Sequence, residues 1–211
     1  MKALITGASS GIGRDMARYL SSLGYDLVIV ARRQNLLEEL KKDLKTNIEI
    51  ECMDISNENN CKELFEKYPD VDILINNAGF GKFGEFIDEE ISMINTNIVA
   101  VQILTKLYLQ RMQEKNKGHI LNVASIAGLL PGGPLMSTYY ATKSYIVSMT
   151  RSIAEELRIK NSDVKVHALC PGPVNTNFNN IANVKFSLRG LPSEYVARYT
   201  IDKMLKNKKI I

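Results

Sequence analysis

Tyr139 and Lys143 lie four residues apart in the segment Ser-Thr-Tyr-Tyr-Ala-Thr-Lys. On a helix this spacing puts a phenol and an ammonium group on the same face. At a separation of about 5 Å and an effective dielectric constant of about 20, their attraction is worth roughly 3 kcal/mol, which would lower the tyrosine pKa from about 10 by roughly two units. The pair is a candidate general acid and base, although ordinary solvated helix faces also carry this spacing. Tyr140, three residues from Lys143, is an alternative partner.

The glycine-rich segment near the start of the chain is a candidate phosphate-binding loop. It reads Thr-Gly-Ala-Ser-Ser-Gly-Ile-Gly over residues 6–13, between a short apolar run and a helical pattern. Glycines at a strand-to-helix turn let the backbone approach a pyrophosphate, and the helix amino terminus favours its negative charge. The spacing differs from the general Gly-x-Gly-x-x-Gly fingerprint, and a tight structural turn is the alternative. Its position favours dinucleotide binding by Gly7, Ser9, Ser10, Gly11, Ile12 and Gly13.

The end of the second apolar run carries two arginines, Arg32 and Arg33. A fold that selects NAD has an acid here for the ribose 2′-hydroxyl, whereas arginine attracts the 2′-phosphate of NADP. One charge-assisted contact is worth roughly 1.5–3 kcal/mol, which is about tenfold to a hundredfold in affinity. The sequence therefore predicts a preference for NADP over NAD. Arg14, after the third glycine, is a further candidate for this phosphate, and a solvated helix start is the alternative for all three arginines.

The overall composition is that of an ordinary globular protein. The chain has 211 residues, of which 45% are hydrophobic and 24% charged, so we expect one domain spanning residues 1–211. Its cysteines lack the spacing of metal ligands and indicate thiols in a reducing compartment. His119 and His167 have no ligand set around them in the sequence, so we expect both to be structural and no metal to be bound.

Charge and hydropathy disfavour two classes of partner. The formal net charge of +4 is mild and the lysines are scattered among acids, which disfavours nucleic acid. The residues after Met1 lead into the glycine turn without the apolar core of a signal peptide, and no segment has the apolar length of a membrane span. We therefore expect a cytoplasmic protein that binds neither nucleic acid nor a membrane.

Short apolar runs alternate with longer amphipathic stretches, which indicates βαβ units and a parallel sheet. Most of the runs are continuously apolar, as expected for strands covered on both faces. The predicted strands span residues 2–6, 26–31, 48–53, 73–76, 119–124 and 165–170. The predicted helices span residues 11–23, 36–44, 58–68, 89–113 and 138–158. The last five residues, 207–211, look like the start of one more strand.

Taken in order, the motifs resemble those of the classical short-chain dehydrogenase/reductase family, over residues 6–176. The glycine loop fits the family's Thr-Gly-x-x-x-Gly-x-Gly. The other matching segments are Asp54-Ile55, Asn76-Asn77-Ala78-Gly79, Ser125, Tyr139 with Lys143, and Pro171-Gly172-Pro173-Val174-Asn175-Thr176. Asn97 fits the catalytic asparagine, although Ala100 replaces the usual glycine and leaves Asn95 as the alternative. The resemblance implies a doubly wound α/β Rossmann fold, with a mostly parallel seven-stranded sheet and helices on both faces.

The resemblance also implies roles for single residues. Ser125 would hydrogen-bond the substrate oxygen while Tyr139 protonates it. Lys143 would lower the pKa of Tyr139 and bind the nicotinamide ribose, and Asn97 would hold a water that links Lys143 to solvent. The family register selects Tyr139 over Tyr140. The further cofactor contacts implied are Asp54, Ile55, Asn77, Ala78, Gly79, Pro171, Gly172, Val174 and Thr176, beside Tyr139 and Lys143.

The implied reaction is hydride transfer between NADPH and a carbonyl or alcohol carbon, with aldehydes, ketones or 3-oxoacyl compounds as substrates. We expect specificity in loops 80–86, 129–137 and 177–192, the last as an apolar lid over a hydrophobic carbonyl compound. A non-catalytic NADP-binding module, as regulator or sensor, is the alternative, which the intact serine, tyrosine and lysine disfavour. The family's habit implies a homodimer or homotetramer that associates through the helices 89–113 and 138–158.

Overall fold

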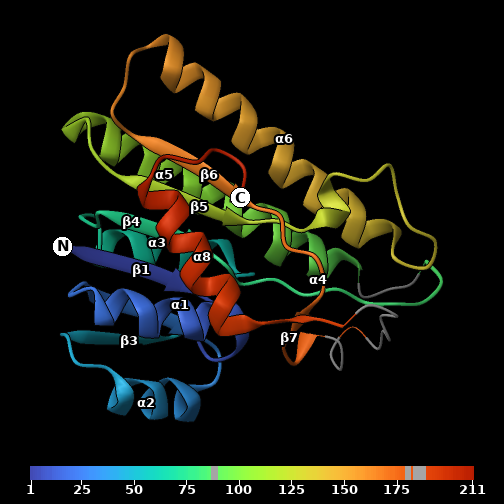
Figure 1. The fold of residues 1–211 in the computed structure, drawn as a ribbon, viewed down its shortest axis with the longest axis horizontal. Helices are drawn as coiled ribbons and strands as arrows, with labels where there is room; N and C mark the ends of the chain where they lie inside the picture. The colour runs from blue at the N-terminus through green and yellow to red at the C-terminus, as the bar shows by residue number, and fades with distance from the viewer. Residues whose placement is uncertain (87–89, 179–181, 183–188) are drawn as a thin grey trace.

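The centre of the fold is a parallel β-sheet. The computed structural model describes residues 1–86, 90–178, 182 and 189–211. Within these ranges six parallel strands pair in the order β3-β2-β1-β4-β5-β6 (Figure 1). They are β1 (Lys2–Thr6), β2 (Asp26–Ala31), β3 (Ile48–Cys52), β4 (Ile73–Asn76), β5 (His119–Val123) and β6 (Lys165–Leu169). The strand order reverses at β1 and β4, and ligands of such sheets bind beside the carboxyl ends at this point.

Helices cover both faces of the sheet (Figure 1). One face carries α1 (Gly11–Ser22), α2 (Gln34–Asp43) and α8 (Ser193–Leu205). The other carries α3 (Glu58–Lys67), α5 (Ala100–Lys115) and α6 (Ser137–Ile159). The neighbours Leu4 and Ile5 on β1 are both fully buried, but in different cores, one on each face. Burial on both faces explains the continuously apolar strands and confirms the doubly wound α/β fold.

Short elements shape the carboxyl edge of the sheet. The helix expected over residues 89–113 is divided into α4 (Glu90–Ile94), a π-helical turn η1 (Asn95–Val99) and α5. A 3₁₀ turn, η2 (Ile126–Gly128), follows β5, and the two-residue strands β7 (Val174–Asn175) and β8 (Leu191–Pro192) pair with each other. π-Helical turns inside α-helices occur frequently at functional sites.

The carboxyl-terminal segment, residues 207–211, lies beside β6, where the sequence predicts the start of one more strand. Ala168 forms an isolated parallel bridge with Ile210. The amide of Ala168 donates to the Lys209 carbonyl at 3.0 Å, and the amide of Ile211 donates to the Ala168 carbonyl at 2.9 Å. One bridge does not make a strand, so the expected seven-stranded sheet is wrong for the described residues, in which the sheet has six strands.

Helix length and polarity bear on membrane insertion. α6 has 23 residues, but Lys143, Arg151 and Glu155 interrupt its apolar sequence. None of the helices in the described part of the chain is both long and apolar enough to cross a membrane.

Candidate active site

The glycine loop is held against the end of β4 by Asn77. Gly7 has φ +69°, and a Cβ atom there would lie 2.7 Å from the Cα of Ala78. The Asn77 side chain donates from Nδ2 to the carbonyls of Thr6 at 3.0 Å and of Gly7 at 3.1 Å. Only glycine combines this backbone conformation with this close approach. The loop after β1 and the segment after β4 are thus fastened together at one edge of the sheet.

Gly13 serves the same packing from within α1. A Cβ atom at Gly13 would overlap the Asn77 side chain and lie 2.7 Å from the Gly7 carbonyl oxygen. Gly13 does not line the cavity described below, so the structure places this predicted cofactor residue behind the loop. Its place fits the helix-packing role of the third glycine in dinucleotide-binding turns.

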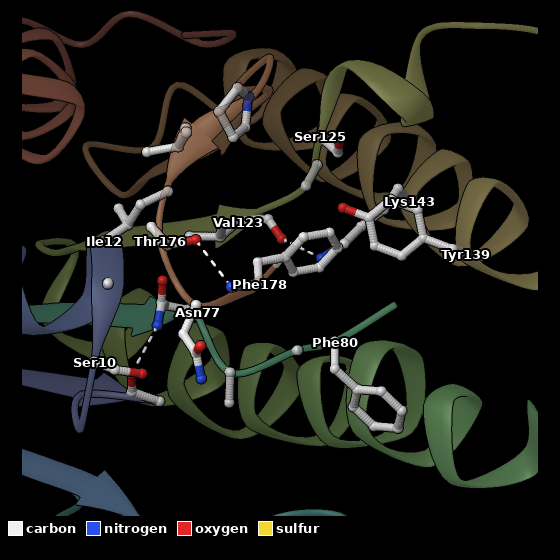
Figure 2. Close-up of a pocket in the computed structure, with 18 of the residues that line it drawn as sticks. Ser10, Ile12, Asn77, Phe80, Val123, Ser125, Tyr139, Lys143, Thr176 and Phe178 are labelled. Atoms are coloured by element: carbon white, nitrogen blue, oxygen red, sulfur yellow. Dashed lines mark hydrogen bonds between the residues drawn. The ribbon is translucent and has the colours of Figure 1, made fainter. Parts of the chain in front are cut away.

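A cavity of about 810 Å³ lies along the carboxyl edge of the sheet (Figure 2). Its volume lies within the range of cofactor and small-molecule sites. The glycine loop, which leaves no room for side chains, and the amino terminus of α1 suit the pyrophosphate of a dinucleotide. The predicted cofactor residues that line the cavity are Gly7, Ser9, Ser10, Gly11, Ile12, Arg32, Arg33, Asp54, Ile55, Asn77, Ala78, Gly79, Tyr139, Lys143, Pro171, Gly172, Val174 and Thr176.

The two arginines after β2 have different contacts. Arg33 donates from Nη2 to the Ser9 hydroxyl at 2.9 Å and to the Ser10 hydroxyl at 3.0 Å, so it lies across the loop. Arg32 lies 3.7 Å, Nη1 to Oδ2, from Asp54, and its side chain is 73% exposed. Burial raises the pKa of Asp54, but hydrogen bonds from Ser56 and the charge of Arg32 outweigh it, so the net shift is downward and the carboxylate is ionised.

Arg14 points elsewhere. Its Nε lies 3.6 Å from the Asp15 carboxylate, and the residue does not line the cavity. Asp15 is buried and also accepts a hydrogen bond from the Ser193 hydroxyl at the start of α8. The pairing with Asp15 and the absence from the cavity lining disfavour Arg14 as a ligand of the 2′-phosphate, and that role stays a prediction.

Ser125, Tyr139 and Lys143 meet at the other end of the cavity (Figure 2). Ser125 precedes η2 and accepts a hydrogen bond from the Ala127 amide at 3.1 Å, which fixes its side chain at the end of β5. Lys143 donates to the Val123 carbonyl at 2.9 Å, and its Nζ lies 5.8 Å from the centre of the Tyr139 ring. The hydroxyl, the phenol and the ammonium group are all buried.

Burial controls the protonation of these groups. It lowers the pKa of Lys143 to about 8. It raises the pKa of Tyr139, and the hydrogen bond with Ser125 offsets this only in part. The depressed tyrosine pKa expected from the helix spacing is therefore wrong for the protein itself. Desolvation of the phenol is the larger effect, and the lysine contacts a carbonyl oxygen.

Asn97 lies in the π-helical turn η1 and is 1% exposed. Its Oδ1 accepts from the Phe80 amide at 3.1 Å, and its Nδ2 donates to the Phe80 carbonyl at 2.9 Å. A Cβ atom on Gly79 would lie 3.0 Å from the Asn97 Oδ1 and 3.4 Å from the Lys143 Nζ. Asn97 and Lys143 therefore flank Gly79 together, although Asn97 itself does not line the cavity.

The sequence pattern of the short chain dehydrogenase family matches residues 1–185. The chain belongs to this family. It is 34% identical to the 3-oxoacyl-[acyl-carrier-protein] reductase FabG of Rickettsia felis over 187 residues, which cover 87% of this chain and 76% of the relative. The fold is similar to that of a short-chain dehydrogenase from Sphingobium yanoikuyae in complex with NADPH, with a TM-score of 0.90 and 27% identity over 99% of this chain and 86% of the other.

A second similar structure is a short-chain dehydrogenase/reductase from Burkholderia phymatum in complex with NAD, with a TM-score of 0.88 and 26% identity over 100% of this chain and 87% of the other. With the family shown, the chain is an NAD(P)-dependent oxidoreductase. These relatives give no support to the alternative of a non-catalytic NADP-binding module.

Tyr140 also lines the cavity of this short-chain dehydrogenase. Its ring centre lies 6.5 Å from that of Tyr139, and it packs closely over Gly133, where a Cβ atom would lie 2.8 Å from the Tyr140 hydroxyl. The contacts with Ser125 and Lys143 belong to Tyr139. The contacts in the structure thus distinguish Tyr139 from Tyr140, whereas the spacing to Lys143 alone does not.

Apolar side chains surround Tyr139 on the side away from the glycine loop. Tyr139 packs with Met136, Phe80 and Phe178, and the Phe178 ring centre lies 5.5 Å from that of Tyr139. Phe80 and Met136 come from two of the loops expected to set specificity, and Phe178 from the third. Ile126 and Ala127 also line the cavity, a role that the sequence analysis did not assign, although their place directly after Ser125 is a signal for it.

The expected lid, residues 177–192, is described only in part. Asn177 and Phe178 line the cavity. Ile181, Val184, Phe186 and Leu188, whose apolar side chains suggest a lid, lie outside the described residues. In the part of the chain that is described, no three histidine, cysteine or acidic side chains are grouped so that they could hold a metal ion.

Proposed function

We propose that this protein is an NADPH-dependent reductase of apolar carbonyl compounds, with 3-oxoacyl compounds as one candidate class. The observation that carries the proposal is that Ser125, Tyr139 and Lys143 meet in the same cavity as the glycine loop. The nicotinamide, when bound, supplies or accepts a hydride at the carbonyl or alcohol carbon. The bound cofactor would be held by the glycine loop, by Asp54 and Ile55, and by the segment 171–176.

Ser125 and Tyr139 act on the substrate oxygen. In the reducing direction the Ser125 hydroxyl hydrogen-bonds the carbonyl oxygen, and the Tyr139 phenol gives it a proton as negative charge develops. Because burial raises the pKa of Tyr139, the phenol carries its proton at neutral pH. The site can therefore deliver a proton to the substrate oxygen at neutral pH.

Lys143, together with a water held beside Asn97, resupplies the proton that Tyr139 gives to the substrate. Burial lowers the pKa of Lys143 to about 8, so the group can both hold and release a proton near neutral pH. Asn97 flanks the same space beside Gly79. A water held there links Lys143 to solvent, so that Tyr139 recovers its proton after each turnover.

The preference for NADPH rests on Arg33 and Arg32. Both residues line the cavity, and the Arg33 guanidinium lies against the serine hydroxyls of the glycine loop, where the ribose 2′-phosphate of a bound cofactor would lie. The relatives include a complex with NADPH and one with NAD, so the family alone does not select the cofactor. Arg33 lies nearer the serine hydroxyls and is the main determinant of the preference.

The apolar lining around Tyr139 defines the substrate class. Phe80, Met136, Phe178, Ile126 and Leu130 face the cavity there, and such a lining favours uncharged carbonyl compounds with alkyl or aromatic substituents. The FabG relative is a 3-oxoacyl-[acyl-carrier-protein] reductase, which makes 3-oxoacyl compounds a reasonable class to test.

The protein as a whole is proposed to be a cytoplasmic homodimer or homotetramer. We expect residues 1–211 to form one domain in which the cofactor and the substrate share a cavity, and residues 177–192, of which 179–181 and 183–188 lie outside the described residues, to act as a lid over the substrate. Association follows the family's habit, through the surfaces of α5 and α6.

Tyr139→Phe tests the proposal, with Tyr140→Phe as the matched control. Loss of the Tyr139 hydroxyl removes the proton donor, so kcat should fall by at least about a hundredfold while NADPH binding is nearly unchanged. Tyr140→Phe should retain most of its activity, because Ser125 and Lys143 contact Tyr139. The measurements are NADPH oxidation over a panel of aldehydes, ketones, quinones and 3-oxoacyl esters, and NADPH binding by fluorescence. Full turnover by Tyr139→Phe would exclude the assignment.

A further inference from the structure

Thr142 lies between the two catalytic candidates of α6, but its side chain points to the body of the protein. It is 1% exposed. Its hydroxyl donates to the Tyr139 carbonyl at 2.8 Å and accepts from the Asn97 Nδ2 at 3.2 Å. One hydroxyl group therefore joins the first turn of α6 to the π-helical turn η1.

Both N–H groups of the Asn97 amide are engaged by this arrangement, and its oxygen accepts one hydrogen bond. The Phe80 amide can only donate and the Phe80 carbonyl can only accept, so the two contacts with Phe80 fix which end of the Asn97 side chain carries the oxygen. Nδ2 has two hydrogens, of which one goes to the Phe80 carbonyl and the other to Thr142. Without the Thr142 hydroxyl, a buried N–H group would lose its acceptor, and the amide would have to turn or shift.

Movement of the Asn97 amide would affect both the wall of the substrate cavity and the space beside Lys143. Phe80 lines the cavity and packs with Tyr139, and its backbone is held by the Asn97 amide at both its N–H and its carbonyl. The Asn97 Oδ1 also flanks Gly79 beside the Lys143 ammonium. A shift of Asn97 would thus displace one wall of the cavity relative to Tyr139, and change the space next to Lys143.

We propose that Thr142 is a positioning residue for the reaction: its hydroxyl fixes the Asn97 amide, and through it the Phe80 wall, relative to Tyr139 and Lys143. The proposal rests on the proposed function, because the roles of Tyr139, Lys143 and Asn97 are assigned there. Thr142 touches neither cofactor nor substrate, and it does not line the cavity. Its effect should therefore appear in the chemical step and not in cofactor binding.

The test compares Thr142→Val with Thr142→Ser and with a control at Thr200. Valine keeps the shape and removes the hydroxyl, so kcat should fall about tenfold to a hundredfold, while the dissociation constant of NADPH is unchanged. Serine keeps the hydroxyl and should restore most of kcat. Thr200→Val removes an equally buried helical hydroxyl, which donates to the Val196 carbonyl in α8, and it should leave kcat unchanged.

A double variant separates positioning from simple loss of stability. If the hydroxyl acts through Asn97, Thr142→Val should lower kcat much less in the Asn97→Ala background than in the wild type. Equal losses in both backgrounds, or wild-type kcat for Thr142→Val, would overturn the proposal. Should Thr142→Val not fold, Thr142→Ala takes its place: it also removes the hydroxyl, so it should lower kcat in the wild-type background and much less in the Asn97→Ala background, and equal losses in both would overturn the proposal. Tyr139→Phe is measured in parallel: if it is active, the proposed function fails, and if it is inactive while Thr142→Val is normal, only the positioning role fails.

Discussion

Arg33 and Arg32 show how neighbouring residues of one type can be placed for different tasks. Arg33 reaches the hydroxyls of Ser9 and Ser10, whereas Arg32 is largely exposed and lies beside Asp54. A phosphate near the serines would replace neutral acceptors of Arg33 with a charged one, and such contacts are roughly twice as strong. Arg32 already lies beside the Asp54 carboxylate, so the same phosphate would compete with that carboxylate for the Arg32 guanidinium.

Cofactor preference should therefore respond unequally to the arginines. Arg33→Ala should lower the ratio of kcat/KM for NADPH to that for NADH by about tenfold to a hundredfold, since one charge-assisted contact is lost. Arg32→Asp should shift the ratio in the same direction by repelling the phosphate. Arg14→Ala is the control and should leave it unchanged, because Arg14 does not line the cavity. An unchanged ratio in both the Arg33 and the Arg32 variant would place recognition of the 2′-phosphate elsewhere.

At the scale of elements, a histidine pair connects β5, β6 and the carboxyl-terminal segment. His167 is fully buried, and its Nδ1 lies 2.7 Å from the Lys208 carbonyl oxygen, which can only accept. Because burial disfavours the charged form of both rings, His167 is neutral, and its Nε2 then accepts from the His119 Nδ1 at 3.1 Å. Burial lowers the pKa of His119, and lowers that of His167 to about 4.

The pair predicts a loss of stability in mild acid. The unfolded chain binds protons at its histidines below about pH 6.5, while the folded protein resists until about pH 4, so stability falls as the pH drops through this window. The part due to His167 is roughly 3 kcal/mol. Urea unfolding at pH 7.5 and pH 5 should show about 2 kcal/mol of it, because pH 5 lies partway through the window. His167→Asn, whose amide can still donate to the Lys208 carbonyl, should flatten the pH dependence; an unchanged slope would show that other groups cause it.

At the scale of the whole molecule, the cavity and the surface where we expect subunits to associate lie on different parts. Loops at the carboxyl ends of the strands line the cavity. α5 contributes no residue to this lining, and α6 contributes residues of its first two turns. On the outer side of these two helices Tyr145 is 40% exposed, and its hydroxyl donates to Gln102 of α5 at 2.9 Å. This pair joins the two helices at the surface where we expect subunits to meet.

Light scattering should therefore give a mass of two or four times the 23.7 kDa of the chain. Tyr145→Asp puts a charge on the expected interface and should lower the mass, because charged residues are depleted from the centres of interfaces. Leu23→Asp, at a position 43% exposed at the end of α1, is the control and should not change it. A monomer in the unaltered protein would contradict the proposed association.

Much of the fold was predictable because the apolar runs and the glycine turn act locally. The strand bounds expected from the sequence agree with the structure to within about one residue. The division of the helix before Lys115 by the π-helical turn was not predictable, because residues 95–99 contain neither glycine nor proline to mark a break. Nor was the strand number, since one bridge at Ala168 decides it.

The sequence by itself determined the family, the parallel α/β fold and the short set of residues that can carry the chemistry, because these depend on residue type and order. The tertiary structure decided how those residues stand to one another. It placed Arg33 against the glycine loop and Arg14 beside Asp15, and it brought Asn97 beside Lys143. It also showed that burial raises the pKa of Tyr139, where spacing alone predicted a lower pKa. Desolvation and long-range contacts depend on the packed surroundings of a group, which spacing along the chain does not contain.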